Sequence, residues 1–172
     1  MTKKILVIYI SAFALLFLFG CSSATEFIIS EEQMPTFKAK TVDIIDKTTT
    51  ENISAETIEI FESRLKKKLL DDGLFQRGDD LKIEYVFFQG DHGSPLLSCC
   101  LTPFALGFVG VKGFFWVQIK LTNSKGDILR ILEIKDSINY NIFNLWGITS
   151  SYNDLLEKNA DVISSYIILH FN

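Results

Sequence analysis

The chain has 172 residues, which is enough for one domain with a single core. Its 21 acidic residues outnumber its 17 basic ones and give a net charge of −4 at pH 7. An acidic chain lacks the positive surface that holds nucleic acid, so we expect no nucleic-acid partner. Hydrophobic residues make up 48% of the chain and 15 of its residues are phenylalanine, which indicates a substantial core or a surface that faces lipid.

The start of the chain is typical of an export signal. Lys3 and Lys4 form a short basic segment, an apolar run covers residues 5–19, and Gly20 precedes Cys21. A cysteine directly after such a cleavage point resembles the bacterial lipobox, which implies a diacylglyceryl group on Cys21 and a mature chain that begins there. The apolar run is shorter than the roughly 20 residues that span a bilayer, so a retained membrane helix is the less favoured alternative.

Lipidation determines where we expect the protein. Several acyl chains bury many CH₂ groups at roughly 0.8 kcal/mol each, so the anchor is effectively permanent. Ser22 follows the cysteine. In Gram-negative lipoproteins an aspartate at that place commonly signals retention in the inner membrane, and the serine resembles the outer-membrane default. We therefore expect the protein to be anchored on the periplasmic face of the outer membrane, which makes this membrane its first partner.

The chain divides into a signal peptide, a tether and one domain. Residues 1–20 form the signal, and residues 21–38, which are mixed in character, are predicted to be a tether. In an alternative interpretation the apolar patch around Phe27 docks on the fold. Residues 39–172 form the domain and contain an apolar insert at 96–111.

The first half of the domain begins with a strand. Residues 40–46 are β-branched and alternate in polarity, which predicts a strand. Ser54 is a suitable N-cap for a helix that ends near Gly73. The stripe on that helix is Ile58, Phe61, Leu65 and Leu69.

The second half is predicted to contain three strands and a helix. Residues 81–87, 115–121 and 128–135 alternate, with a hairpin loop at 123–127. Ser151 resembles the start of a capping box. The helix that follows has the stripe Tyr152, Leu156, Ala160, Ile163 and Ile167. This order predicts an α+β fold with an antiparallel or mixed sheet of about four strands and both helices on one face.

The domain resembles a class of small bacterial lipoproteins that contain a domain of unknown function. The resemblance covers residues 41–168 and rests on Ile53-Ser-Ala-Glu, on Leu70-x-x-Gly-Leu-Phe, and on Ala160-Asp with Tyr166. That class is similar in outline to envelope assembly lipoproteins such as the curli-secretion lipoprotein and penicillin-binding-protein activators. The resemblance implies a compact α+β accessory protein that faces the periplasm, and it supplies no catalytic residue.

Candidate catalytic and metal-binding groups are few. His92 follows Asp91 and is the best candidate for a general base, but adjacency in sequence does not aim the carboxylate at the ring. His170 lies at the end of the predicted helix. Cys99 and Cys100 are either free thiols or a strained vicinal disulfide, and no Cys-x-x-Cys pattern indicates zinc. We expect no catalytic residue, no metal and no cofactor, and therefore not an enzyme.

The apolar insert at 96–111 is the feature that a simple soluble domain does not need. It contains no charged residue, and its proline and glycines argue against one continuous helix. It is either folded over the core or exposed to a bilayer or partner, in which case Leu97, Phe104, Leu106 and Phe108 are the expected contacts.

Two main hypotheses for function follow, and a hydrolase centred on His92 is the third and least favoured. The first is an outer-membrane-anchored lipoprotein with a non-enzymatic accessory or assembly role, acting through contacts with an unidentified envelope protein. The alternative is a lipoprotein that binds lipid or another hydrophobic ligand.

Overall fold

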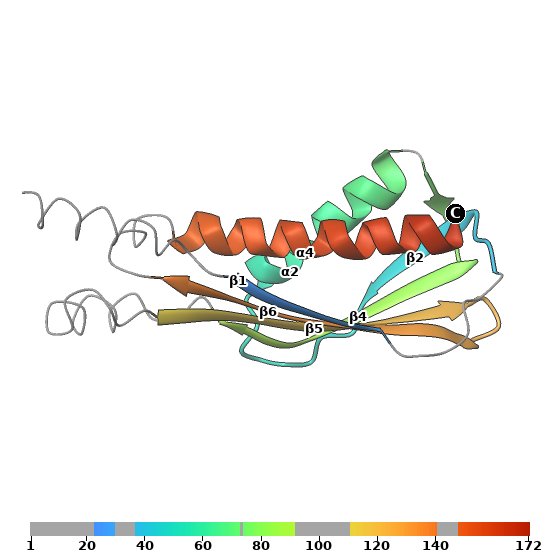
Figure 1. Cartoon of the computed structure of the whole chain (residues 1–172). Coiled ribbons are helices and arrows are strands. Elements are labelled where there is room, and N and C mark those ends of the chain that lie inside the picture. The colour runs from blue at the N-terminus through green and yellow to red at the C-terminus, as the bar shows by residue number, and fades with distance from the viewer. Residues whose placement is uncertain (1–22, 30–36, 73, 92–110, 141–147) are drawn as a thin grey trace, which may run out of the picture.

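The computed structural model describes residues 23–29, 37–72, 74–91, 111–140 and 148–172, and within them a sheet carries two α-helices on one face (Figure 1). The elements are β1 (Ser23–Ile29), β2 (Thr41–Asp46), α2 (Ala55–Lys66), the π-helical turn η1 (Lys67–Asp71), β3 (Gln76–Arg77), β4 (Leu81–Asp91), β5 (Val111–Asn123), β6 (Ile128–Tyr140) and α4 (Ile148–Phe171). The six strands lie in the order β1-β6-β5-β4-β2-β3.

The sheet is mixed in direction. β2 runs parallel to both β3 and β4, whereas the β4–β5, β5–β6 and β1–β6 pairs are antiparallel. α2 lies in the connection from β2 to β4, because parallel neighbours require a long crossover. The predicted α+β class with two helices is confirmed, but the expected sheet of about four strands is too small, since six are present.

The two additional strands have different origins. β1 lies within residues 21–38, the expected tether, and pairs antiparallel with β6. The ring of Phe27 packs edge-on against Tyr166 of α4 at 6.1 Å, so this patch docks on the fold, as the alternative interpretation had it. β3 has two residues and pairs only with Thr41 and Val42, which is too short for any alternation to appear in the sequence.

The core lies between the helices and one face of the sheet. Ser54 caps α2 as predicted, because its Oγ accepts a hydrogen bond from the Thr57 backbone N–H at 3.1 Å. Phe61, Leu65 and Leu69 of the first helical stripe are fully buried, whereas Ile58 is half-buried. The whole predicted stripe of α4 is buried, as are the alternating residues Phe115, Val117, Ile119 and Leu121 of β5.

Several predicted boundaries are wrong. α4 begins at Ile148, so Ser151 lies inside the helix and does not cap it. Residues 89–91, which lie beyond the strand predicted at 81–87, continue β4 and pair with β5. The hairpin loop at 123–127 is confirmed, and Gly126 takes a φ of 90° that favours glycine. Within the described residues, no helix combines the length and apolar character that crossing a membrane requires.

Candidate functional site

The face of the sheet away from the helices carries a group of aromatic side chains. Phe88 and Phe114 are 43% and 38% exposed, although their neighbours Phe87 and Phe115 are fully buried on the other face. The rings of Phe88 and Trp116 lie 4.8 Å apart and are tilted by 37°. We call Phe88, Phe114, Trp116 and Lys135 the open-face cluster.

Strand register places this cluster. Trp116 of β5 lies opposite Lys135 of β6. A bulge in β4 between Phe87 and Gln89 interrupts the pairing with β5 and leaves Phe88 beside Trp116. The cluster therefore lies across three neighbouring strands, toward the end of the sheet where β4 ends and β5 begins.

A lysine covers part of the Trp116 ring. The Lys135 Nζ lies 4.7 Å from the ring centroid, within the range of a cation–π contact. The same Nζ is 2.8 Å from a carboxylate oxygen of Glu133. The hydrogen bond to Glu133, with a further contribution from Glu26 of β1, outweighs desolvation and raises the pKa of Lys135. The cation over the tryptophan is therefore held in its charged form.

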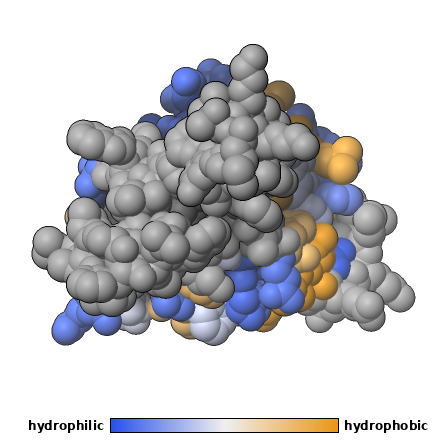
Figure 2. Space-filling model, turned by 60° about the vertical axis from the view of Figure 1, so that its left-hand side comes forward, coloured by the Kyte–Doolittle hydropathy of each residue, from blue (hydrophilic) through white to orange (hydrophobic). Residues whose placement is uncertain are grey.

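The indole N–H of Trp116 has no hydrogen-bond partner among the described residues, although the nitrogen is buried. A buried donor without a partner is uncommon and costs free energy. Farther along this face, polar and apolar side chains are mixed and half-exposed: Lys120 lies 3.8 Å from Glu84, and Gln118 lies opposite the apolar Val86. The face thus combines exposed aromatic rings with a charged border. Figure 2, turned by 60° from the view of Figure 1, shows hydrophobic residues next to hydrophilic ones at the surface.

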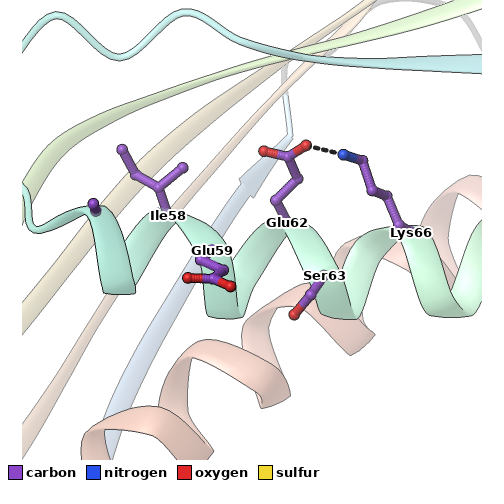
Figure 3. Close-up of a pocket in the computed structure, with 6 residues that line it drawn as sticks. Ile58, Glu59, Glu62, Ser63 and Lys66 are labelled. Carbon is purple, nitrogen blue, oxygen red and sulfur yellow. Dashed lines mark ion pairs between the residues drawn. The ribbon is translucent and has the colours of Figure 1, made fainter.

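A second surface feature is a hollow along α2. It has a volume of about 350 Å³ and is lined by Ala55, Ile58, Glu59, Glu62, Ser63 and Lys66. Figure 3 shows Ile58, Glu62 and Lys66 pointing to the same side of the helix.

Glu62 joins this hollow to the core. Its carboxylate forms an ion pair with Lys66 and accepts a hydrogen bond from the buried Tyr85 hydroxyl at 2.8 Å. Burial would raise the pKa of Glu62, but the bonds from Lys66 and Tyr85 outweigh it and lower that pKa. Burial and the neighbouring Glu62 raise the pKa of Tyr85. Tyr85 therefore remains a neutral donor, which suits a structural role.

An ion-pair network joins the two helices. Arg64 of α2 donates two hydrogen bonds to Asp161 of α4, at 2.8 and 2.7 Å, and lies 3.3 Å from Glu157. The Arg64 hydrogen bonds outweigh desolvation and lower the pKa of Asp161, and the same bonds raise the pKa of Arg64. A two-pronged contact of this kind fixes the helices relative to each other.

A buried carboxylate lies beneath α4. Asp136 is 1% exposed and accepts hydrogen bonds from the Asn159 side chain at 3.2 Å and from the Ser137 backbone at 2.8 Å. Lys158 approaches it to 3.8 Å. This group was not predicted from the sequence, although Asp136 alternates with buried residues of β6, which indicates the core face.

Most of the predicted site residues lie outside the described residues. These are Cys21, His92, Leu97, Cys99, Cys100, Phe104, Leu106 and Phe108, and the predictions on them stay predictions. His170 is described: its ring lies 4.4 Å from that of Tyr166 in the last turn of α4. Among the described residues, no three histidine, cysteine or acidic side chains gather in a way that suits a metal ion.

No family model and no curated protein matches the chain. Among solved structures, a PelC dodecamer from Paraburkholderia phytofirmans is similar at 12% identity and a TM-score of 0.45, over 87% of this chain and 99% of that one. A second PelC dodecamer from the same organism, which carries a single substitution, is similar at 12% identity and a TM-score of 0.42, over 88% of this chain and 99% of that one.

Proposed function

We propose that this chain is a bacterial envelope lipoprotein, anchored through Cys21 on the periplasmic face of the outer membrane. In this proposal its folded part acts without catalysis, as an accessory or assembly subunit that binds another envelope protein. The observation that carries the proposal is the open-face cluster, where Phe88 and Phe114 remain exposed on the face that the helices do not cover.

The composition of the cluster supports a protein partner. Tryptophan and other aromatic side chains dominate the energetics of protein interfaces because they bury a large area with few rotatable bonds. Lys135 and Glu133 form a charged border beside Trp116 and provide the polar rim that such interfaces have. A lipid anchor would also hold the domain near partners in the same membrane and raise their effective concentration.

Site-specific photocrosslinking in cells tests the partner. A photoreactive phenylalanine analogue replaces Phe88 or Phe114, and a control places it at Lys125 in the exposed loop between β5 and β6. We expect one discrete protein adduct from the two cluster positions and none from Lys125. Adducts to lipid alone would support the alternative of lipid binding, and equal labelling at all three positions would contradict a specific surface.

The anchor is tested separately. Cys21→Ser removes the thiol that would carry the diacylglyceryl group, so we expect loss of lipidation and an uncleaved signal. Mass spectrometry of the N-terminus of both proteins measures this. An unmodified Cys21 in the wild-type chain, or a mature chain that begins elsewhere, would contradict the lipoprotein assignment.

A further inference from the structure

One edge of the sheet is only partly covered. β2 pairs along its length with β4, but on its other side the described residues pair with it only at Thr41 and Val42, through β3. The last part of β2, from Asp43 to Asp46, therefore has an outer edge without a described strand partner. Such an edge is a template for another strand, and proteins that do not use it usually block it.

The backbone of β2 directs its hydrogen-bonding groups outward at alternate residues. The carbonyl groups of Lys40 and Val42 accept hydrogen bonds from Gln76 and Gly78 on the outer side, at 3.0 and 3.2 Å. The Lys47 N–H instead bonds to Tyr85 of β4 at 2.9 Å. Because the direction alternates along a strand, the N–H and C=O groups of Ile44 and Asp46 face the outer edge.

A groove follows the same edge. A hollow of about 380 Å³ is lined by Val42, Asp43 and Ile44 of β2, and also by Lys66 and Leu70 of the helical segment and by residues 77–79. Side chains of consecutive strand residues point to opposite faces, so a hollow that all three line lies at the edge of the strand. Lys66 also lines the 350 Å³ hollow along α2, so the two hollows have this residue in common and lie on either side of it.

The groove has apolar positions and an excess of negative charge. Ile44, Ile58 and Leu70 are among the lining residues, are half-buried and pack against the core. Four carboxylates line the two hollows, against two cations, and one of those cations, Lys66, is already paired with Glu62. The carboxylates are Asp43, Glu59, Glu62 and Asp79. A ligand that is complementary to this groove alternates apolar and basic side chains.

We propose that the groove between β2 and α2 binds an extended, basic peptide segment of a partner protein, which adds to the sheet as a strand beside Ile44 and Asp46. The peptide backbone would pair with the outward groups of these two residues, its apolar side chains would enter the hollows, and its lysine or arginine side chains would meet the carboxylates. The groove shares no residue with the open-face cluster, so this inference and the proposed function can fail independently.

A displayed library of short random peptides, selected on the detergent-solubilised full chain, provides the probe. Counter-selection uses Ile44→Pro. Proline removes the outward N–H of residue 44 and its ring blocks the strand edge, so a peptide strand cannot pair there. An edge position of a sheet tolerates proline, so we expect this variant to fold. We expect enriched peptides that alternate apolar residues with lysine or arginine. The best of these is synthesised, and we expect it to bind Ile44→Pro about tenfold or more weakly than wild type.

Charge variants and amide exchange complete the test. Glu59→Lys, within the groove, should weaken the peptide severalfold, whereas Glu56→Lys, an exposed residue of the same helix outside the groove, should not. On the unmodified protein, the bound peptide should slow hydrogen exchange at the Ile44 and Asp46 amides. No enrichment over Ile44→Pro, equal binding to both proteins, or protection only around Trp116 would each overturn the proposal.

Discussion

The aromatic contacts around Phe61 hold the centre of the core. The Phe61 ring lies 5.1 Å from that of Phe87, 5.4 Å from that of Tyr85 and 6.0 Å from that of Phe115, mostly in edge-to-face geometry. Each such pair contributes roughly 0.5–1.5 kcal/mol beyond the area that it buries. Phe61 thus packs α2 against both β4 and β5.

Truncation of Phe61 or its neighbour Leu65 should therefore be costly. We expect Phe61→Ala and Leu65→Ala each to lower the free energy of unfolding by about 2–5 kcal/mol, because both side chains are fully buried and leave cavities. Lys67→Ala, at an exposed position, should cost less than about 0.5 kcal/mol. Denaturant unfolding of the three variants measures this, and a costlier Lys67 would show that the buried face of α2 is misassigned.

At the scale of elements, the sequence predicted those with a clear period. The 3,4,4 spacing of α2 and the alternation in β5 each follow from one buried and one exposed face. β1 was missed because Ser23–Ile29 is an edge strand with one described partner, and its burial depends on β6, far away in the sequence. The start of α4 was missed because the capping-box pattern at Ser151 also occurs inside a helix.

The open-face cluster was predictable only in part. Residues 114–117 are Phe-Phe-Trp-Val, so both faces of β5 are apolar at this point, and only the polar Gln118 and Lys120 further along the strand indicate which face is exposed. Phe87 and Phe88 present the same ambiguity in β4. The structure agrees with that direction, since Phe115 is core and Phe114 is surface, and it adds the bulge in β4 that leaves Phe88 beside Trp116.

The two helices are joined by a contact that can be measured as a coupling. Arg64 and Asp161 are partly exposed, at 26% and 34%, so we expect a coupling free energy of about 0.5–1 kcal/mol in a double-mutant cycle with alanine. A control cycle pairs Arg64 with Asp154, an exposed residue of α4, and should show no coupling. Equal coupling in both cycles would indicate a general charge effect.

The same pair predicts a dependence on pH. The pKa of Asp161 is lower in the folded protein than its ordinary value of 3.8, because Arg64 stabilises the carboxylate. The contribution of this ion pair to stability is therefore complete above the pKa of Asp161 in the unfolded chain. It is lost as the pH falls through the lowered pKa of Asp161 in the folded protein. The cycle with Asp161 should give its full coupling at neutral pH and none below the folded pKa. A coupling that persists in acid would contradict the assigned ion pair.

At the scale of the whole molecule, the sheet has one face packed by helices and one face without them (Figure 1). A single layer of helices on a sheet makes one core, and the opposite face needs polar residues or a partner to cover its apolar groups. The charged pairs Lys120–Glu84 and Lys135–Glu133 serve this need over part of the face, but Phe88 and Phe114 remain exposed.

Adjacent phenylalanines on opposite faces provide a matched test of this arrangement. Phe87→Ser and Phe115→Ser should each lower the free energy of unfolding by several kcal/mol, because each leaves a cavity and a buried hydroxyl. Phe88→Ser and Phe114→Ser should cost less than about 1.5 kcal/mol, chiefly the ring contact with Trp116 for Phe88. Thermal or denaturant melts of the four proteins make the comparison.

The same four variants also separate stability from binding. If the open face is a contact surface, Phe88→Ser and Phe114→Ser should keep the fold and lose the photocrosslinked adduct. In each variant the photoreactive analogue is placed at the other of the two positions. A cost at Phe88 equal to that at Phe87 would mean that both faces of the sheet are core. The face without helices would then be covered within the chain itself, and the protein partner would have to bind elsewhere.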